Sequence, residues 1–267
     1  MEKDVSLVTS ARDAGVTTIR LNQPDSGNAL SVRSASQLFN HVQAAAEDSR
    51  VRCVLLTGAG RFFCVGGDVK GLQQAGANVG TMIEQLTGPL HRAIGMLLRM
   101  DKPLVVAVNG PVAGGGLGLA LTGDIVLAAR SAHFSMAYGG IGFSPDGAST
   151  WLLPRLIGLR RAQEMALMNR RLSSDEAVTL GLVTRCIEDE ALAGEAQAVA
   201  RTLADGPIGA FAATRRLLLA SGAATPEAQM AAEAASVRRQ AEGPEGQEGL
   251  NAFTERRPAD FTGISKN

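Results

Sequence analysis

The chain has 267 residues, 45% of them hydrophobic, and its 26 basic and 26 acidic side chains give a formal net charge of zero. This length and hydrophobic fraction suffice for one large folded domain, or for a domain with a small appendage, and exclude a disordered or fibrous protein. The balanced charge does not favour nucleic acid or an anionic membrane surface as a partner, so local groups would have to bind any anionic ligand.

Cysteine usage and the first residues indicate the cellular setting. Cys53, Cys64 and Cys186 are scattered, with no CxxC pair and no metal-ligand spacing. This argues against a zinc site or a disulfide framework and fits a reducing compartment. Residues 1–6 show neither the basic nor the apolar part of a secretory signal, so we expect a cytoplasmic protein.

Strands and helices are predicted to alternate through most of the chain. Short apolar or alternating runs predict strands at 5–8, 16–21, 51–56, from Pro103 onward, 125–128 and 133–136. The first two of these form a hairpin that turns at residues 13–15. Helices are predicted after Ser31, as N-cap, and over residues 82–100. The pattern indicates a mixed α/β fold.

The segment from Lys102 to Asp124 carries the strongest functional signal. An apolar strand there leads directly into Gly114, Gly115 and Gly116, which open a helix. The first N–H groups of a helix lack internal partners and carry partial positive charge, so they stabilise an oxygen that gains negative charge. Glycines allow that oxygen to come close.

The segment from Lys102 to Asp124 has three other interpretations. Its 21 uncharged residues would be long enough for a membrane span, but six glycines, two prolines and Asn109 interrupt them. A dinucleotide site would need GxGxxG, and the stretch from Gly116 lacks the third glycine. Close packing of a strand against a helix, without any function, remains an alternative for the segment taken alone.

The last third of the chain predicts helices. Ser173 and Glu176 form a capping box, and Gly181 suits the end of that helix. From about residue 190 the sequence is alanine-rich, with breaks at 206–207, 222–226 and 243–244. We therefore expect a core over residues 1–190 and a helical region over residues 191–267 that serves as an association surface.

Four motifs together resemble one known family. In order and spacing, the chain is similar to the enoyl-CoA hydratase/isomerase (crotonase) superfamily at Asn28-Ala29-Leu30, Phe63–Asp68, Asn109–Gly116 and Gly142–Gly147. The resemblance covers nearly the whole chain. It implies a spiral of ββα units with a C-terminal helical subdomain, a homotrimer or dimer of trimers, and an acyl-CoA thioester substrate with no metal and no further cofactor.

The resemblance also assigns roles to individual residues. It implies an oxyanion hole formed by the main-chain N–H groups of Gly67 and Gly115. It places CoA beside Ala29, Leu30 and the loop from Gly66 to Asp68. Arg256 falls where relatives offer a basic residue to the CoA phosphates, although an exposed helical arginine is more often only solvated.

The chain departs from the hydratases of this family at two positions. Where they carry two glutamates that place and deprotonate water, this sequence has Gly118 and Tyr138, neither of which is a carboxylate base. Gly118 lies on the same helix face as Gly115. We expect its missing side chain to make room for a bulky acyl group; a close-packed neighbour is the alternative.

Asp146 is the carboxylate that remains. Its surroundings, Ser144-Pro145-Asp146-Gly147, are typical of a simple turn. However, residues 141–155 resemble the ring-1,2-epoxyphenylacetyl-CoA isomerases and related enoyl-CoA isomerases, in which this aspartate is the acid/base. A single carboxylate suits a proton shuttle, so we predict an acyl-CoA isomerase.

Other functions remain open. The 4-chlorobenzoyl-CoA dehalogenases of the same superfamily have a nucleophilic aspartate at the position of Asp146, an aromatic residue at Tyr138 and a histidine at His91. His91 would then activate water, although a plain surface or packing role suits it better. A hydratase that activates water differently and a catalytically weak acyl-CoA-binding protein are the remaining alternatives.

Overall fold

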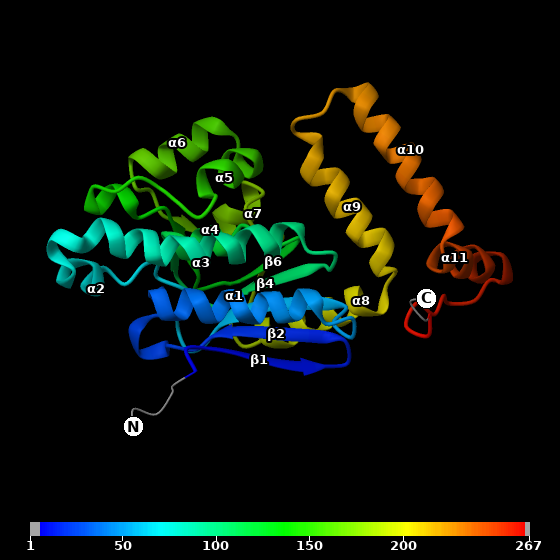
Figure 1. Cartoon of the computed structure of the whole chain (residues 1–267), viewed down its shortest axis with the longest axis horizontal. Coiled ribbons are helices and arrows are strands. Elements are labelled where there is room, and N and C mark those ends of the chain that lie inside the picture. The colour runs from blue at the N-terminus through cyan, green and yellow to red at the C-terminus, as the bar shows by residue number, and fades with distance from the viewer. Residues whose placement is uncertain (1–5, 265–267) are drawn as a thin grey trace.

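A sheet covered by helices, with a helical arm extending from it, forms the protein (Figure 1). The computed structural model describes residues 6–264. The main sheet has six strands in the order β1-β2-β3-β4-β6-β9, and a smaller sheet has the order β5-β7-β8. The strands are β1 Val8–Asp13, β2 Val16–Leu21, β3 Cys53–Gly58, β4 Leu104–Val108, β5 Val112–Ala113, β6 Ile125–Ala129, β7 His133–Ser135, β8 Leu172–Ser173 and β9 Arg185–Ile187.

Strand β1 differs from the prediction. It runs antiparallel to β2, and Asp13 pairs with Val16 across a two-residue turn. That register places β1 at residues 8–13, after the predicted 5–8, and Val5 lies outside the described residues. The sequence signal failed because most side chains of this edge strand are exposed, so the strand shows no apolar alternation. The remaining neighbours in the main sheet pair in parallel.

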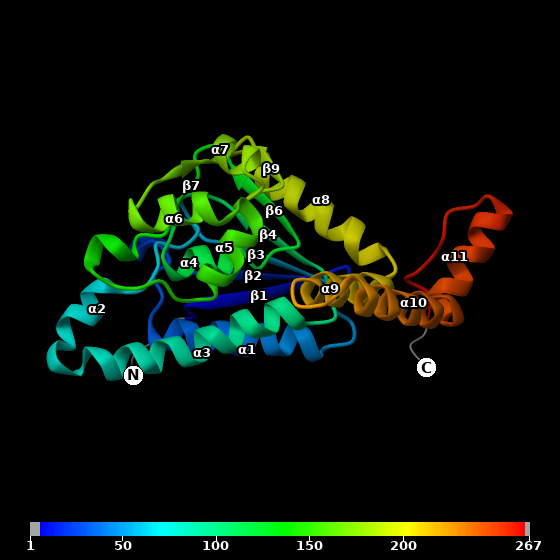
Figure 2. The same ribbon diagram turned by 90° about the horizontal axis from the view of Figure 1, so that it is seen from above.

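Helices cover both faces of the main sheet. Figure 2 shows α1 and α3 below the sheet and α8 above it. The predicted N-cap is confirmed, since Ser31 and Ser34 form a reciprocal capping box at the start of α1. The helices are α1 Val32–Glu47, α2 Val69–Gln74, α3 Val79–Arg99, α4 Gly115–Ala120, α5 Ser149–Ile157, α6 Leu159–Leu167, α7 Ser174–Thr179, α8 Leu192–Asp205, α9 Ile208–Ser221, α10 Pro226–Glu242 and α11 Pro244–Glu255, with short 3₁₀ turns η1 Pro24–Ser26, η2 Gly76–Asn78 and η3 Tyr138–Ile141.

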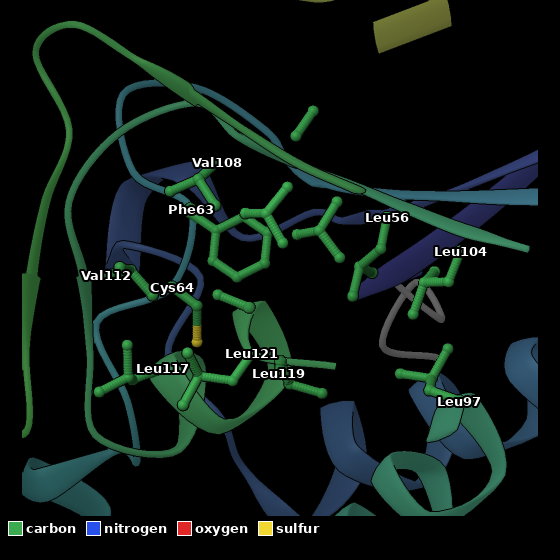
Figure 3. Packing of buried hydrophobic residues seen from close by; sticks show 14 of the residues in the cluster. Leu56, Phe63, Cys64, Leu97, Leu104, Val108, Val112, Leu117, Leu119 and Leu121 are labelled. Carbon is green, nitrogen blue, oxygen red and sulfur yellow. The ribbon is translucent and has the colours of Figure 1, made fainter. Parts of the chain in front are cut away.

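The core surrounds the short helix α4. All five residues of β4 and all six of α4 are buried. Figure 3 shows Leu117 and Leu119 of α4 packed within the same cluster as Phe63 and Cys64. A helix buried on every side cannot tilt without opening a cavity, so the glycine turn that starts it has a fixed position.

Buried cations bind the C-terminal carbonyls of helices. Lys102 is 5% exposed, and its ammonium donates to the carbonyls of Ala45 and Asp48, both at 2.6 Å, at the end of α1. Arg215 of α9 donates to the carbonyls of Leu97 and Met100 at the end of α3. Both interactions place positive charge at the negative end of a helix dipole.

The predicted helical region divides into two parts. Helix α8 packs on the main sheet through Leu192, Ala196, Ala200 and Ala204. Helices α9 to α11 form the arm at the other side of the molecule from α2 (Figure 1). The breaks predicted at 206–207, 222–226 and 243–244 all separate helices. Among residues 6–264, no helix has the length and apolar character needed to cross a membrane.

Candidate active site

Two chain segments that are far apart in the sequence meet at one glycine-rich corner. The N–H of Leu30 donates to the carbonyl of Gly66 at 2.7 Å, and the N–H of Asp68 donates to the carbonyl of Leu30 at 2.9 Å. This short parallel pairing uses the groups on either side of Gly67, and within residues 6–264 the N–H of Gly67 has no acceptor. The side chain of Asp68 caps α2 by accepting from the N–H of Gly71 at 3.1 Å.

The second segment is the turn into α4. Gly114 has φ 53° and ψ −129°, a conformation that favours glycine, and Gly115 is the first helical residue. The N–H of Ala113 donates to the carbonyl of Cys64 at 3.0 Å, which joins this turn to the one before Gly67. In the described part of the chain, the N–H of Gly115 likewise has no acceptor. Two unpaired main-chain donors therefore lie at the same corner.

A cavity of about 520 Å³ opens beside these donors. Gly67 and Gly115 both line it, together with Tyr138 and Asp146. Among the described residues that line this cavity, Asp146 is the one with a carboxylate. The remaining lining is mainly apolar and comes from Leu30, Val65, Val69, Leu72, Ile83, Leu86, Leu90, Ala137, Ile141, Phe143 and Pro145.

Asp146 has two side-chain neighbours. The Tyr138 hydroxyl donates to its Oδ1. Burial, and then the charge of Asp146, raise the pKa of Tyr138 far above its usual value, so the hydroxyl keeps its proton. Nε2 of His91 lies 3.5 Å from Oδ2. The N–H of Gly147 lies 3.3 Å from the same Nε2, so this nitrogen is close to both Gly147 and Asp146.

His91 does not belong to the cavity lining. It lies on α3, and its side chain is 51% exposed. The structure thus brings together three of the residues singled out from the sequence. Asp146 and Tyr138 line the cavity, and His91 lies beside Asp146 outside the lining.

Hydrogen bonds and helix contacts fix the loop that carries Asp146. Ser149 donates to the carbonyl of Asp146 from Oγ at 2.6 Å and from its N–H at 3.1 Å. Ala137 and Ala148, on either side of the loop, have φ of 60° and 59°. Non-glycine residues rarely adopt this conformation, and it persists where the surrounding structure enforces it.

The expectation that Gly118 makes room for an acyl group is wrong. A Cβ built on Gly118 would lie 2.4 Å from the carbonyl oxygen of Gly147, and Gly118 does not line the cavity. The backbone that carries Asp146 occupies the space where a side chain on α4 would be. The close-packed neighbour, the alternative weighed from the sequence, is therefore what the structure contains.

The residues predicted to hold CoA are partly gathered here. Leu30 and Gly66 line the cavity. Ala29, next to Leu30, and Asp68, next to Gly67, do not line it. Arg256 forms the end of α11 with φ 55°. In Figure 1 this helix lies at the opposite end of the molecule from α2, which contributes to the cavity.

The sequence analysis missed the apolar rim of the cavity. Val65, Val69, Ile141 and Phe143 all line it although each is exposed. They occur in or beside glycine-rich segments, where no helix or strand pattern requires an apolar side chain. Apolar residues at such positions were the signal that could have revealed the rim. In the part of the chain that the structure describes, no group of three His, Cys, Asp or Glu side chains could hold a metal ion.

Comparison with known proteins gives consistent matches along the chain. The sequence profile of the family described as enoyl-CoA hydratase/isomerase matches residues 11–264. The chain is 36% identical to the 1,2-epoxyphenylacetyl-CoA isomerase of Escherichia coli K12 over 263 residues, which cover 97% of this chain and 99% of the relative. It is 34% identical to the 4-chlorobenzoyl coenzyme A dehalogenase-2 of an Arthrobacter species over 194 residues, which cover 72% and 70% of the two chains.

Solved structures agree with these matches. The crystal structure of an enoyl-CoA hydratase from Polaromonas sp. JS666 superposes with a TM-score of 0.91 at 30% identity. The match covers 95% of this chain and 98% of that one. The architecture is thus the crotonase fold that the motifs implied, with a C-terminal helical region.

Proposed function

Because the chain belongs to the enoyl-CoA hydratase/isomerase family, we propose that it is an acyl-CoA isomerase that moves a proton along an enoyl- or aryl-acyl group. One observation carries the proposal. Among the described lining residues, Asp146 is the single carboxylate in a cavity that also holds the unpaired N–H groups of Gly67 and Gly115. A single base beside an oxyanion hole suits proton transfer.

The two N–H groups would bind the thioester oxygen. Negative charge on this oxygen grows when the carbon next to the C=O loses a proton, and preorganised donors stabilise it. Loss of one such donor typically costs about 3–4 kcal/mol of transition-state stabilisation. The main chain at Ala29–Leu30 and Gly66–Asp68 would hold the CoA part.

Asp146 would then act as a shuttle. Its carboxylate removes a proton from C2 of a 3-enoyl thioester, which leaves a dienolate whose charge is shared between the thioester oxygen and C4. The protonated Asp146 returns the proton to C4, and the double bond moves to C2–C3. No atom is gained or lost, and the carboxylate ends as it began.

Packing around Gly118 supports an isomerase over a hydratase. The hydratases that this chain resembles carry a glutamate there, and in this protein the Gly147 carbonyl fills that space. With Tyr138 at the second glutamate position, water addition would lack both of its usual bases.

A dehalogenase is the second candidate. It is favoured by the contact between His91 and Asp146 and by the similarity to the Arthrobacter enzyme. Against it, His91 lies outside the cavity lining, and its Nε2 accepts from Gly147. An aryl ester on Asp146 in a His91→Gln variant, detected by intact-protein mass spectrometry, would favour the dehalogenase.

A three-substrate assay tests the proposal. We expect turnover of a 3-enoyl-CoA to the conjugated 2-enoyl-CoA, followed by absorbance, and little hydration of 2-enoyl-CoA or release of chloride from 4-chlorobenzoyl-CoA. Asp146→Asn should lower kcat by at least about 10³-fold, because it removes the only proposed acid/base. Asp205→Asn, an exposed acid at the end of α8, is the matched control and should keep full activity.

Two outcomes would contradict the isomerase. Full turnover by Asp146→Asn would remove the assigned base. Tight binding of all three thioesters without turnover would instead indicate an acyl-CoA-binding protein.

We also propose that the chain assembles as a homotrimer or a dimer of trimers through its helical arm. Large apolar side chains are exposed along α9 to α11, namely Leu218, Met230, Val237, Leu250 and Phe253. Arg256 ends this arm and is remote from the cavity of its own chain. Its proposed contact with CoA phosphates therefore requires the site of another copy.

A further inference from the structure

The hydroxyl of Tyr138 lies close to both halves of the candidate active site. It donates to Oδ1 of Asp146, and a Cβ built on Gly115 would lie 3.9 Å from the hydroxyl oxygen. The tyrosine thus lies between the proposed oxyanion donor and the proposed base. We propose that Tyr138 is a positioning residue that holds the Asp146 carboxylate in one orientation, an inference that rests on the proposed isomerase function.

The tyrosine itself is firmly held. Its N–H donates to the carbonyl of Met136 at 2.8 Å, and its carbonyl accepts from the N–H of Phe143 at 3.1 Å. Its ring packs against the hydrophobic core from η3. Because the tyrosine is anchored in this way, its hydroxyl fixes the position of the Asp146 carboxylate.

The hydroxyl of Tyr138 stays a donor to the carboxylate. Burial, and then the charge of Asp146, raise the pKa of Tyr138, so the hydroxyl keeps its proton across the working pH range. The tyrosine therefore acts on the position of Asp146 rather than as a base of its own.

The other titratable groups nearby do not replace this interaction. His91, on α3, faces Oδ2 of Asp146 with an Nε2 that accepts from Gly147. Cys64 lies behind Tyr138, and burial raises the pKa of its thiol to about 12, so it is neutral. Among the described residues, Tyr138 is the one side chain that donates a hydrogen bond to the Asp146 carboxylate.

The hydrogen bond from Tyr138 makes the two carboxylate oxygens of Asp146 different. Oδ1 is occupied by the tyrosine hydroxyl, so Oδ2 keeps the lone pairs that are free to take and return a proton. With rotation of the carboxylate blocked, the same oxygen serves both ends of the shuttle.

The kinetics of a Tyr138→Phe variant test the role. The substitution removes the hydroxyl donor and keeps the ring. We expect kcat to fall about tenfold, because the base is no longer held in place, while KM for the thioester stays within about twofold.

The matched control removes the same kind of contact elsewhere. Thr262 donates from its hydroxyl to the Asp260 carboxylate at 2.7 Å, far along the chain from the cavity. Thr262→Val should leave kcat and KM unchanged. A normal kcat in Tyr138→Phe, or a KM that rises as much as kcat falls, would overturn the positioning role.

A second measurement needs no activity. Tyr138 is the only tyrosine in the chain, so biosynthetic incorporation of 3-fluorotyrosine gives a protein with a single fluorine resonance. Asp146→Asn should shift this ¹⁹F resonance, because the hydroxyl then faces a neutral amide in place of the carboxylate. A resonance that is unchanged in Asp146→Asn would contradict the contact even if isomerase activity is found. Conversely, turnover by Asp146→Asn would reject the isomerase mechanism whatever the fluorine spectrum shows.

Discussion

At the scale of single residues, the absence of a side chain at Gly118 affects both activity and stability. A methyl group there would lie 2.4 Å from the Gly147 carbonyl, so Gly118→Ala must displace the loop that carries Asp146. We expect kcat to fall about 10- to 100-fold and the free energy of unfolding to fall by about 1–3 kcal/mol. Enzyme assays and urea denaturation would measure the two effects.

The control for this substitution is a helical glycine with space around it. Gly194 of α8 is exposed, and a Cβ there would have no atom within 4 Å. Gly194→Ala should raise the unfolding free energy by about 0.5–1 kcal/mol and leave activity intact. A Gly118→Ala enzyme as active as its parent would show that the loop is free to move.

Sequence reasoning at this scale could not read what packing decides. The resemblance of four motifs to one family placed Gly67, Gly115 and Asp146 at one expected site, and all three line the same cavity, while their catalytic roles stay predictions. The reason for Gly118 was not readable, because its neighbour Gly147 is 29 residues away and is backbone rather than side chain. The hydrogen bond from Tyr138 to Asp146 likewise depends on the conformation of the loop between them.

At the scale of elements, Arg215 joins α9 to the end of α3. Its guanidinium donates to the carbonyls of Leu97 at 2.8 Å and Lys102 at 2.7 Å, and it pairs with Asp124 at 2.8 Å. Its side chain is 10% exposed. We expect Arg215→Ala to lower the unfolding free energy by about 3–5 kcal/mol, because Asp124 and several carbonyls lose their donor.

The adjacent arginine provides the comparison. Arg216 pairs with Asp101, and both side chains are at least half exposed. Arg216→Ala should change stability by about 1 kcal/mol or less. Equal effects of the two substitutions, measured by denaturant unfolding with the same m-value, would contradict the capping role of Arg215.

Local rules predicted most elements but not all of their limits. The capping box formed by Ser173 and Glu176 and the proline and glycine breaks of the helical region are confirmed. These signals are short-range, so they can be read directly from the sequence. Strand β1 was misplaced because pairing with β2, rather than its own pattern, decides where it lies.

At the scale of the whole molecule, the arm formed by α9 to α11 leads to a prediction about assembly. Its exposed apolar side chains would be covered in a trimer or a dimer of trimers. Sedimentation should then give three or six times the 27.7 kDa mass of the chain. Glutamate at both Leu218 and Met230 should shift the protein to smaller species, whereas Ala193→Glu, an exposed position on α8, should not. A parent protein that sediments as a monomer at micromolar concentration would rule out this use of the arm.

The overall architecture was predictable because the order of the motifs is characteristic of the family. What the sequence could not supply was the direction in which the arm leaves the sheet, since no local pattern specifies the angle between α8 and α9. The arm lies at the opposite end of the molecule from α2, which contributes residues to the cavity (Figure 1).

The contact between Gly118 and Gly147 also constrains how this protein can evolve. A descendant with hydratase chemistry would need a carboxylate on α4, but any side chain there collides with the strand of backbone that presents Asp146. The first mutation on that path would therefore displace Asp146, the proposed acid/base, before it created another activity. Compensating changes in residues 142–148 would have to come first. A single substitution at Gly118 would therefore not convert the proposed isomerase into a hydratase.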